Sequence, residues 1–126
     1  PRPTPKNPGK VYDQAYFDRW YREPATRVKH SGTMARKVAM VVAVAEHYLE
    51  RPIRSVLDVG CGEGGFGEAL AALRPNCHYL GLDSSAYAVG RFGLKRNLRL
   101  LDFAELAHQR FDRSYDVLVC TDVMHY

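Results

Sequence analysis

The sequence predicts an α/β fold, a doubly wound parallel sheet with helices on both faces. Two observations point to this class. From residue 55 onwards, short apolar runs alternate with segments of helical periodicity, which is the pattern of repeated strand–helix–strand units. The first apolar run also leads directly into a turn that holds Gly60, Gly62, Gly64 and Gly65. Such a glycine turn joins a buried strand to a helix and lets the backbone approach a ligand.

The N-terminal fifty residues precede this alternation. Residues 1–10 hold four of the seven prolines and no apolar side chain beyond them, so we expect a disordered tail. Aromatic side chains recur every four residues between Val11 and Glu23, which predicts a helix that Pro24 ends. We expect this helix to pack on the domain by its aromatic face; the alternative is a flap over a ligand pocket.

A second helix is expected from Ser31 or Thr33, both good N-caps, to about Glu50. Pro52 then ends it. We treat residues 11–50 as a pair of N-terminal helices and a possible lid. The second helix has an apolar stripe formed by Met34, Val38, Val41, Val42, Ala45 and Leu49.

Residues 51–126 are expected to form the sheet domain. Strands are predicted at 55–59, 79–82, 98–101 and 117–120, and helices at 64–73, 85–92 and, more weakly, 104–109. The fourth strand is almost wholly apolar, which is typical of a strand buried on both faces. Its outer edge has no partner before the sequence stops at Tyr126. We therefore expect either a missing C-terminal half, with the chain truncated after this strand, or a partner chain that completes the sheet.

Composition is ordinary for one globular domain, with 46% hydrophobic and 25% charged residues among 126. No apolar run approaches the roughly 20 residues that a membrane helix needs, and the N-terminus does not resemble a signal peptide. The three cysteines have no metal-binding spacing. We expect a reduced, cytoplasmic protein without a metal site.

The formal net charge of +4 raises the question of nucleic acid binding. The basic residues are scattered, however, and none forms a dense run interleaved with aromatics. A solvated surface is the favoured interpretation, and nucleic acid is neither favoured nor excluded.

Polar residues follow each predicted strand, at the edge where ligands bind in doubly wound sheets. Asp58 stands two residues before Gly60, where its charge would repel a pyrophosphate and attract an ammonium group. Asp83 ends the second strand, 23 residues beyond Gly60, and a carboxylate there is placed to accept hydrogen bonds from ribose hydroxyls. Asp102 and Phe103 follow the third strand and suit an adenine ring.

Each of these residues has a structural alternative. Asp83, followed by Ser84 and Ser85, could cap the next helix, and Asp102 could begin a turn. Asp122 and His125 after the fourth strand could be surface groups. The conjunction at four successive strand ends nevertheless favours ligand binding at this edge.

The run Leu57–Gly64, which reads LDVGCGEG, resembles the first motif of class I S-adenosylmethionine-dependent methyltransferases. Residues 55–126 look like the cofactor-binding part of this Rossmann-like fold. The resemblance implies that Gly60, Cys61, Gly62 and Gly64 line the methionine moiety, with Asp58 near its ammonium group. It implies that Asp83 binds the ribose and that Ser84 and Ser85 flank it. It also implies that Asp102 and Phe103 hold the adenine, and that Thr121 and Asp122 lie next to the methionine part and the substrate.

The resemblance implies transfer of a methyl group from S-adenosylmethionine, leaving S-adenosylhomocysteine. His125 is the best candidate for a general base, and Asp122 could orient it. The fourth strand lacks the Asn/Asp-Pro-Pro-aromatic run of DNA and protein amide methyltransferases, which favours O- or C-methylation of a small molecule.

Three alternatives stay open. The acceptor could be RNA or protein, or the chain could be a non-catalytic cofactor-binding module. A NAD-dependent dehydrogenase also matches the spacing of Gly60, Gly62 and Gly65, although Asp58 and the Asp102–Phe103 pair count against it.

Overall fold

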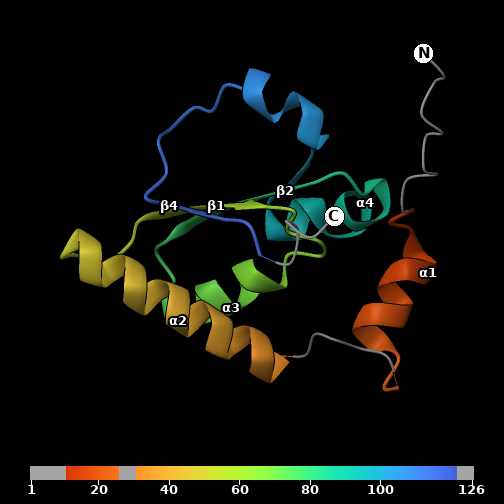
Figure 1. The fold of residues 1–126 in the computed structure, drawn as a ribbon, viewed down its shortest axis with the longest axis horizontal. Coiled ribbons are helices and arrows are strands. Elements are labelled where there is room, and N and C mark those ends of the chain that lie inside the picture. The colour runs from red at the N-terminus through yellow and green to blue at the C-terminus, as the bar shows by residue number, and fades with distance from the viewer. Residues whose placement is uncertain (1–10, 26–30, 122–126) are drawn as a thin grey trace, which may run out of the picture.

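The computed structural model of the chain describes residues 11–25 and 31–121. In it the four strands form one parallel sheet in the order β3–β2–β1–β4 (Figure 1). The first strand therefore lies inside the sheet, between the second and the fourth, and the strand order reverses there. This arrangement confirms the predicted α/β class. The strands are β1 (Ser55–Val59), β2 (His78–Asp83), β3 (Leu98–Leu100) and β4 (Val117–Val119).

One face of the sheet is covered by two helices, α2 (Ser31–Leu49) and α3 (Gly65–Leu73) (Figure 1). The predicted apolar stripe of α2 is confirmed, because its side chains pack into the core on this face. Burial of this stripe, more than intrinsic helix propensity, holds such a helix in place. The core consists of Val38, Val42, Ile53, Val56, Phe66, Leu70 and Val119.

The opposite face has a different cover. Leu57, Val59, Leu80 and Leu82 pack there against the segment that connects β3 to β4. The weak helix expected in this segment is a 3-10 helix, η2 (Phe103–His108). A segment this short closes well with the tighter hydrogen bonds of a 3-10 turn.

Two expectations about element length and burial are corrected. Helix α4 (Ala86–Arg96), which packs against β2 and β3, runs four residues beyond the predicted end and stops at Asn97, whose φ of 57° is left-handed. The predicted burial of the fourth strand on both faces is wrong for the part of the chain that the structure describes. Leu118 is 62% exposed, because α2 covers only the other face of β4.

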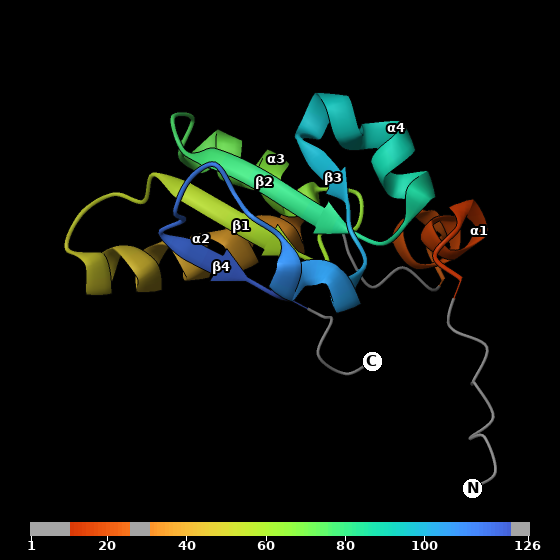
Figure 2. The same ribbon diagram turned by 90° about the horizontal axis from the view of Figure 1, so that it is seen from above.

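The N-terminal strap, which we define as residues 11–25, confirms the expected aromatic helix with a different internal geometry. It begins as α1 (Gln14–Phe17), capped by the Asp13 side chain, and continues as the π-helical turn η1 (Asp18–Arg22). Both views place it beside the carboxyl ends of the strands, near the start of α4 (Figures 1 and 2).

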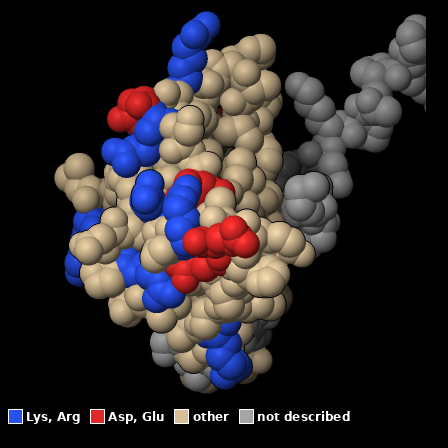
Figure 3. Space-filling view, turned by 90° about the vertical axis from the view of Figure 1, so that its left-hand side faces the viewer, with Lys and Arg blue, Asp and Glu red and all other residues tan. Residues whose placement is uncertain are grey.

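The amino ends of the strands carry paired charges. Arg51 forms a two-pronged ion pair with Asp116, and Arg74 pairs with Glu46. These hydrogen bonds, first those from Arg51 and then one from the Arg54 backbone, lower the pKa of Asp116 to about 2. Basic and acidic side chains are interspersed on this end of the molecule (Figure 3). No single-sign patch dominates this face.

Candidate functional site

The glycine loop, residues 60–64, leads from β1 into α3 and is built on left-handed backbone. Gly60, Gly62 and Gly64 have φ values of 74°, 57° and 83°. Side chains rarely adopt this conformation, so the alternate glycines are required by the path of the chain. Gly62 also lies against the strap, because a Cβ added there would come within 2.7 Å of the Tyr21 hydroxyl.

The backbone N–H groups of the loop are used within the protein. Gly60 and Cys61 both donate to the carbonyl of Leu82, at 2.8 and 3.0 Å. Gly62 donates to the carboxylate of Asp83 at 2.8 Å, and Gly64 donates to the Cys61 carbonyl at 3.1 Å. The end of β2 thus holds the loop, and these amides do not form the open cradle of N–H groups that binds a phosphate.

Asp83 is the residue that joins these elements. One carboxylate oxygen accepts from Gly62, and the other accepts from the Ser85 backbone N–H at 2.8 Å. Asp83 stays half-buried, so lone pairs of this acceptor remain for a ligand hydroxyl. The carboxylate therefore lies at the β2 end, next to the loop, as the sequence predicts.

The two serines after Asp83 differ. Ser85 caps α4: its side chain accepts from Ala88 at 3.1 Å and donates to the Tyr12 carbonyl at 2.5 Å. The helix-capping alternative is thus confirmed for Ser85. Ser84 is exposed at the same edge.

Asp58 lies inside the domain instead of on an open surface. It is 1% exposed, and one oxygen accepts a hydrogen bond from the Tyr79 hydroxyl at 2.7 Å. Burial, followed by the charge of Asp58, raises the pKa of Tyr79, so the phenol stays protonated and donates. The Tyr79 ring lies over α3 where Gly67 leaves room for it, since a Cβ there would come 2.5 Å from the ring.

Cys61 is the one loop side chain with a reactive atom, and it is buried. Its Sγ lies against β2 at Gly81, where an added Cβ would approach it to 2.7 Å. Burial raises the pKa of this thiol, and the charges of Asp58 and Asp83 raise it further.

Sequence reasoning missed the ion pair that joins the loop to the strap. Arg22 Nη2 donates to both carboxylate oxygens of Glu63, at 3.0 and 2.7 Å. On the other side of the loop, Arg96 Nη1 donates to the Glu63 carbonyl at 2.7 Å and Nη2 pairs with Glu68 at 3.0 Å. A pair separated by 41 residues leaves no periodic signal in the sequence.

Three further predicted residues, Asp102, Phe103 and Thr121, follow the ends of β3 and β4. Asp102 caps η2 by accepting from Ala104 at 3.1 Å, and Phe103 is 47% exposed beside it. Thr121 follows β4 and is half-buried. Asp122 and His125 lie outside the described residues.

Two further classes of feature are absent from the described ranges. Within residues 11–25 and 31–121, no group of three or more His, Cys, Asp or Glu side chains could hold a metal ion. None of the helices described is both long and apolar enough to cross a bilayer.

Residues 57–126 match a family model described as "Methyltransferase domain". Two curated proteins each align over a little more than half of the chain. A trans-aconitate 2-methyltransferase of Deinococcus radiodurans is 39% identical over 69 residues, 55% of this chain and 26% of that protein. A probable (S)-tetrahydroprotoberberine N-methyltransferase of Papaver bracteatum is 32% identical over 78 residues, 58% of this chain and 22% of that protein. The matches thus span about a quarter of these relatives.

Solved structures share the fold over more of the chain. A plantazolicin methyltransferase in complex with SAH superposes with a TM-score of 0.64 at 20% identity, covering 82% of this chain and 44% of that one. A magnesium protoporphyrin IX methyltransferase from Synechocystis PCC 6803 with bound SAM superposes with a TM-score of 0.59 at 26% identity. The superposition covers 91% of this chain and 60% of that one.

Proposed function

The chain belongs to the methyltransferase domain family, and from this premise we propose that it binds S-adenosylmethionine at the glycine loop and serves methyl transfer to a small molecule. The loop, the Asp83 carboxylate and the residues after β3 all lie at the carboxyl edge of the sheet, where a nucleoside binds in such folds. The relatives and the solved neighbours are methyltransferases, which supports the same activity.

The observation that carries the proposal is the use of the loop amides. Gly60, Cys61 and Gly62 donate to the end of β2, so these donors are already engaged where a dinucleotide would need them for its pyrophosphate. The Asp83 carboxylate suits ribose hydroxyls, which both nucleotides carry, whereas the charge of Asp58 disfavours a phosphate and suits a ligand with an ammonium group. This favours S-adenosylmethionine over NAD.

The residues present fit this cofactor. The left-handed backbone at Gly60, Gly62 and Gly64 would bring the main chain of the loop close to a methionine moiety. Asp83 would accept from the ribose hydroxyls, with Ser84 beside them, and Asp102 with the exposed face of Phe103 would hold the adenine. Asp58 would act from within the domain, through its charge.

The chemistry supplied by bound S-adenosylmethionine is an activated sulfonium methyl group. The chain's own residues would bind and align the reactants and exclude water from them, which is how proteins accelerate such a displacement. We propose His125 as the general base, with Asp122 orienting it, where the acceptor must lose a proton.

An oxygen or carbon acceptor on a small molecule is the favoured substrate class. The fourth strand and the residues after it read Val117-Leu118-Val119-Cys120-Thr121-Asp122, without the run that is typical of amide methylation of DNA or protein. The N-methyltransferase among the relatives keeps a nitrogen acceptor as the second candidate.

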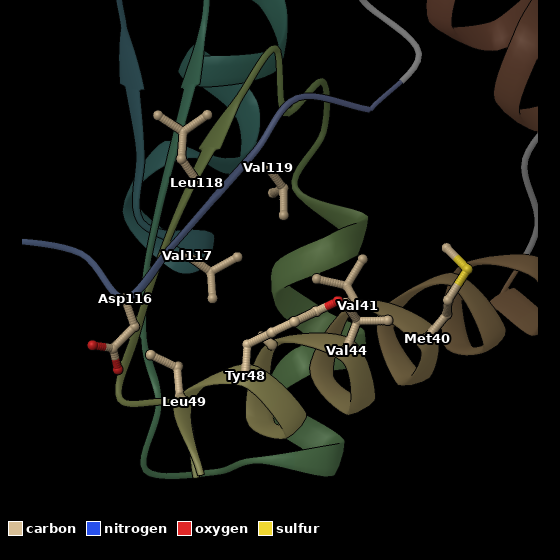
Figure 4. Close-up of a pocket in the computed structure, with 10 residues that line it drawn as sticks. Met40, Val41, Val44, Tyr48, Leu49, Asp116, Val117, Leu118 and Val119 are labelled. Atoms are coloured by element: carbon tan, nitrogen blue, oxygen red, sulfur yellow. The ribbon is translucent and has the colours of Figure 1, made fainter. Parts of the chain in front are cut away.

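A groove along β4 supports the proposal that more polypeptide completes this sheet. It has a volume of about 580 Å³ and lies between α2 and β4 (Figure 4). Met40, Val44 and Tyr48 are exposed along it, an apolar surface that isolated domains rarely leave open. We propose that further chain of the same protein, or a partner chain, packs here and pairs with β4.

Calorimetry with S-adenosylhomocysteine and with NADH on the full-length protein tests the proposal. We expect S-adenosylhomocysteine to bind and NADH not to bind. Asp83→Ala should weaken binding by about a hundredfold, because two hydrogen bonds to a charged acceptor are lost. Asp112→Ala removes an exposed carboxylate from the β3–β4 connection and is the matched control. NADH binding, or no nucleotide binding at all, would overturn the proposal.

A further inference from the structure

Glu63 occupies an unusual position for a carboxylate. It lies in the glycine loop, yet its side chain is only 9% exposed. Buried carboxylates need a partner, because the loss of hydration is not otherwise offset. The partner is Arg22, whose Nη2 donates to both oxygens. Arg22 belongs to the N-terminal strap and not to the sheet domain.

The strap reaches across the carboxyl ends of β1 and β2, where the nucleoside would lie. At one end the carbonyl of Tyr12 accepts from Ser85, the cap of α4. In the middle Phe17 is buried and packs against the Tyr87 ring at 5.7 Å between centroids. At the other end Tyr21 lies against Gly62.

Arg22 makes a charged contact between the strap and the loop. Its Nη1 donates to Asp18 within the strap at 2.9 Å, which orients the guanidinium, while Nη2 binds Glu63. Arg96 holds the Glu63 carbonyl from the opposite side, so Glu63 is also fixed to the sheet domain independently of the strap. Loss of Arg22 would leave the Glu63 carboxylate buried without its guanidinium.

We propose that Arg22 is a positioning residue of the cofactor site. Through Glu63 it fastens the N-terminal strap across the glycine loop, so that the strap forms a wall of the site and slows release of the cofactor. This inference rests on the proposed function for the identity of the ligand. The contact between Arg22 and Glu63 itself does not depend on the identity of the ligand.

The test compares Arg22→Ala with Arg51→Ala in the full-length protein. Both remove an arginine that binds a carboxylate, and the two side chains are similarly exposed, at 37% and 33%. Hydrogen exchange of the strap amides is measured without ligand, and dissociation of S-adenosylhomocysteine is measured by stopped flow. For Arg22→Ala we expect both to accelerate by about tenfold, the effect of losing ~1.4 kcal/mol.

Arg51→Ala should change neither rate, although it lowers the melting temperature. Arg22→Lys keeps the charge and should recover most of the slow exchange and slow dissociation. Unchanged strap exchange in Arg22→Ala would overturn the fastening, and faster exchange with unchanged dissociation would overturn its role at the site. If the unaltered protein binds no S-adenosylhomocysteine, the proposed function fails and the role in release with it. The exchange measurement still decides whether Arg22 holds the strap.

Discussion

The two ends of the sheet use the same chemistry for different purposes. At the amino ends, Arg51 and Asp116 flank strands that already pair in register, Val56 with Val117. At the carboxyl ends, Arg22 and Glu63 join the sheet domain to a strap that forms none of its strands. The Arg51–Asp116 pair stabilises two strands that backbone hydrogen bonds already hold together. The Arg22–Glu63 pair instead helps to hold a separate segment, the strap, against the sheet domain.

The two ends of the sheet also differ in backbone conformation. The glycine loop at the carboxyl ends has three left-handed residues, all glycine. The connection before β1 has one left-handed residue, Glu50, where α2 ends. The left-handed turns of the glycine loop therefore depend on the absence of side chains, and we expect a substitution there to affect binding more than stability.

Gly62→Val gives the largest expected effect and tests that contrast directly. A β-branched residue is strained at a φ of 57°, and its Cβ would come 2.7 Å from the Tyr21 hydroxyl. We expect the affinity for S-adenosylhomocysteine to fall by more than about a hundredfold, while the free energy of unfolding falls by only ~1–3 kcal/mol. Calorimetry and urea denaturation measure the two quantities. If Gly62→Val kept its affinity for S-adenosylhomocysteine, the proposed difference between the two ends of the sheet would be wrong.

Tyr79→Phe tests whether the hydrogen bond between Tyr79 and Asp58 serves stability or cofactor binding. The ring and its place over Gly67 are kept, but Asp58 loses the donor at 2.7 Å. We expect the free energy of unfolding to fall by about 1–3 kcal/mol, the cost of disrupting a buried polar pair. If Asp58 serves the cofactor through its charge, affinity should change less than threefold, a limit of about 0.7 kcal/mol. A larger loss of affinity with unchanged stability would place Tyr79 in the binding site.

Asp116→Asn should have the smallest effect and none on cofactor binding. The carboxylate accepts from Arg51 and from the Arg54 backbone, and because it lies near the surface we expect a loss of about 1 kcal/mol. Urea denaturation at pH 7 measures the loss. A tenfold change in affinity for S-adenosylhomocysteine would show that the amino end also shapes the site.

The same variant tests the pH dependence. The pKa of Asp116 is about 2 in the folded protein against an ordinary 3.8, so the folded state favours the ionised form. Its contribution to stability is full above about pH 5 and is lost as the pH falls from there to about 2. The difference in the free energy of unfolding between the unaltered protein and Asp116→Asn should become smaller as the pH falls over that range. A constant difference would exclude this titration as its cause.

Local patterns were sufficient for most of the fold. The strands, α2, α3 and the glycine loop follow from apolar periodicity and from the alternate glycines. The length of α4 could not be predicted in the same way, because Gly90 and Gly93 weaken the helical signal. Gly93 in fact lets the helix approach β3, since an added Cβ would lie 3.2 Å from the Leu98 carbonyl.

The candidate site was predicted in part. Asp83 was predicted at its place beside the loop because a strand end fixes it. Tyr79, Arg22 and Glu63 were missed because each acts through a partner at least 21 residues away, and one sequence gives no sign of such pairs. The exposed Leu118 was missed because its burial depends on what packs beside β4.

The burial of Cys61 has a consequence for any electrophile held at the loop. A thiolate is the sulfur species that attacks an alkylating centre, and a methyl donor is such a centre. The raised pKa of Cys61 keeps this sulfur as the neutral thiol, and Gly81 gives it a recess in the sheet. At the proposed site, Cys61 would therefore lie beside the methyl donor in a form that resists methylation of the enzyme itself.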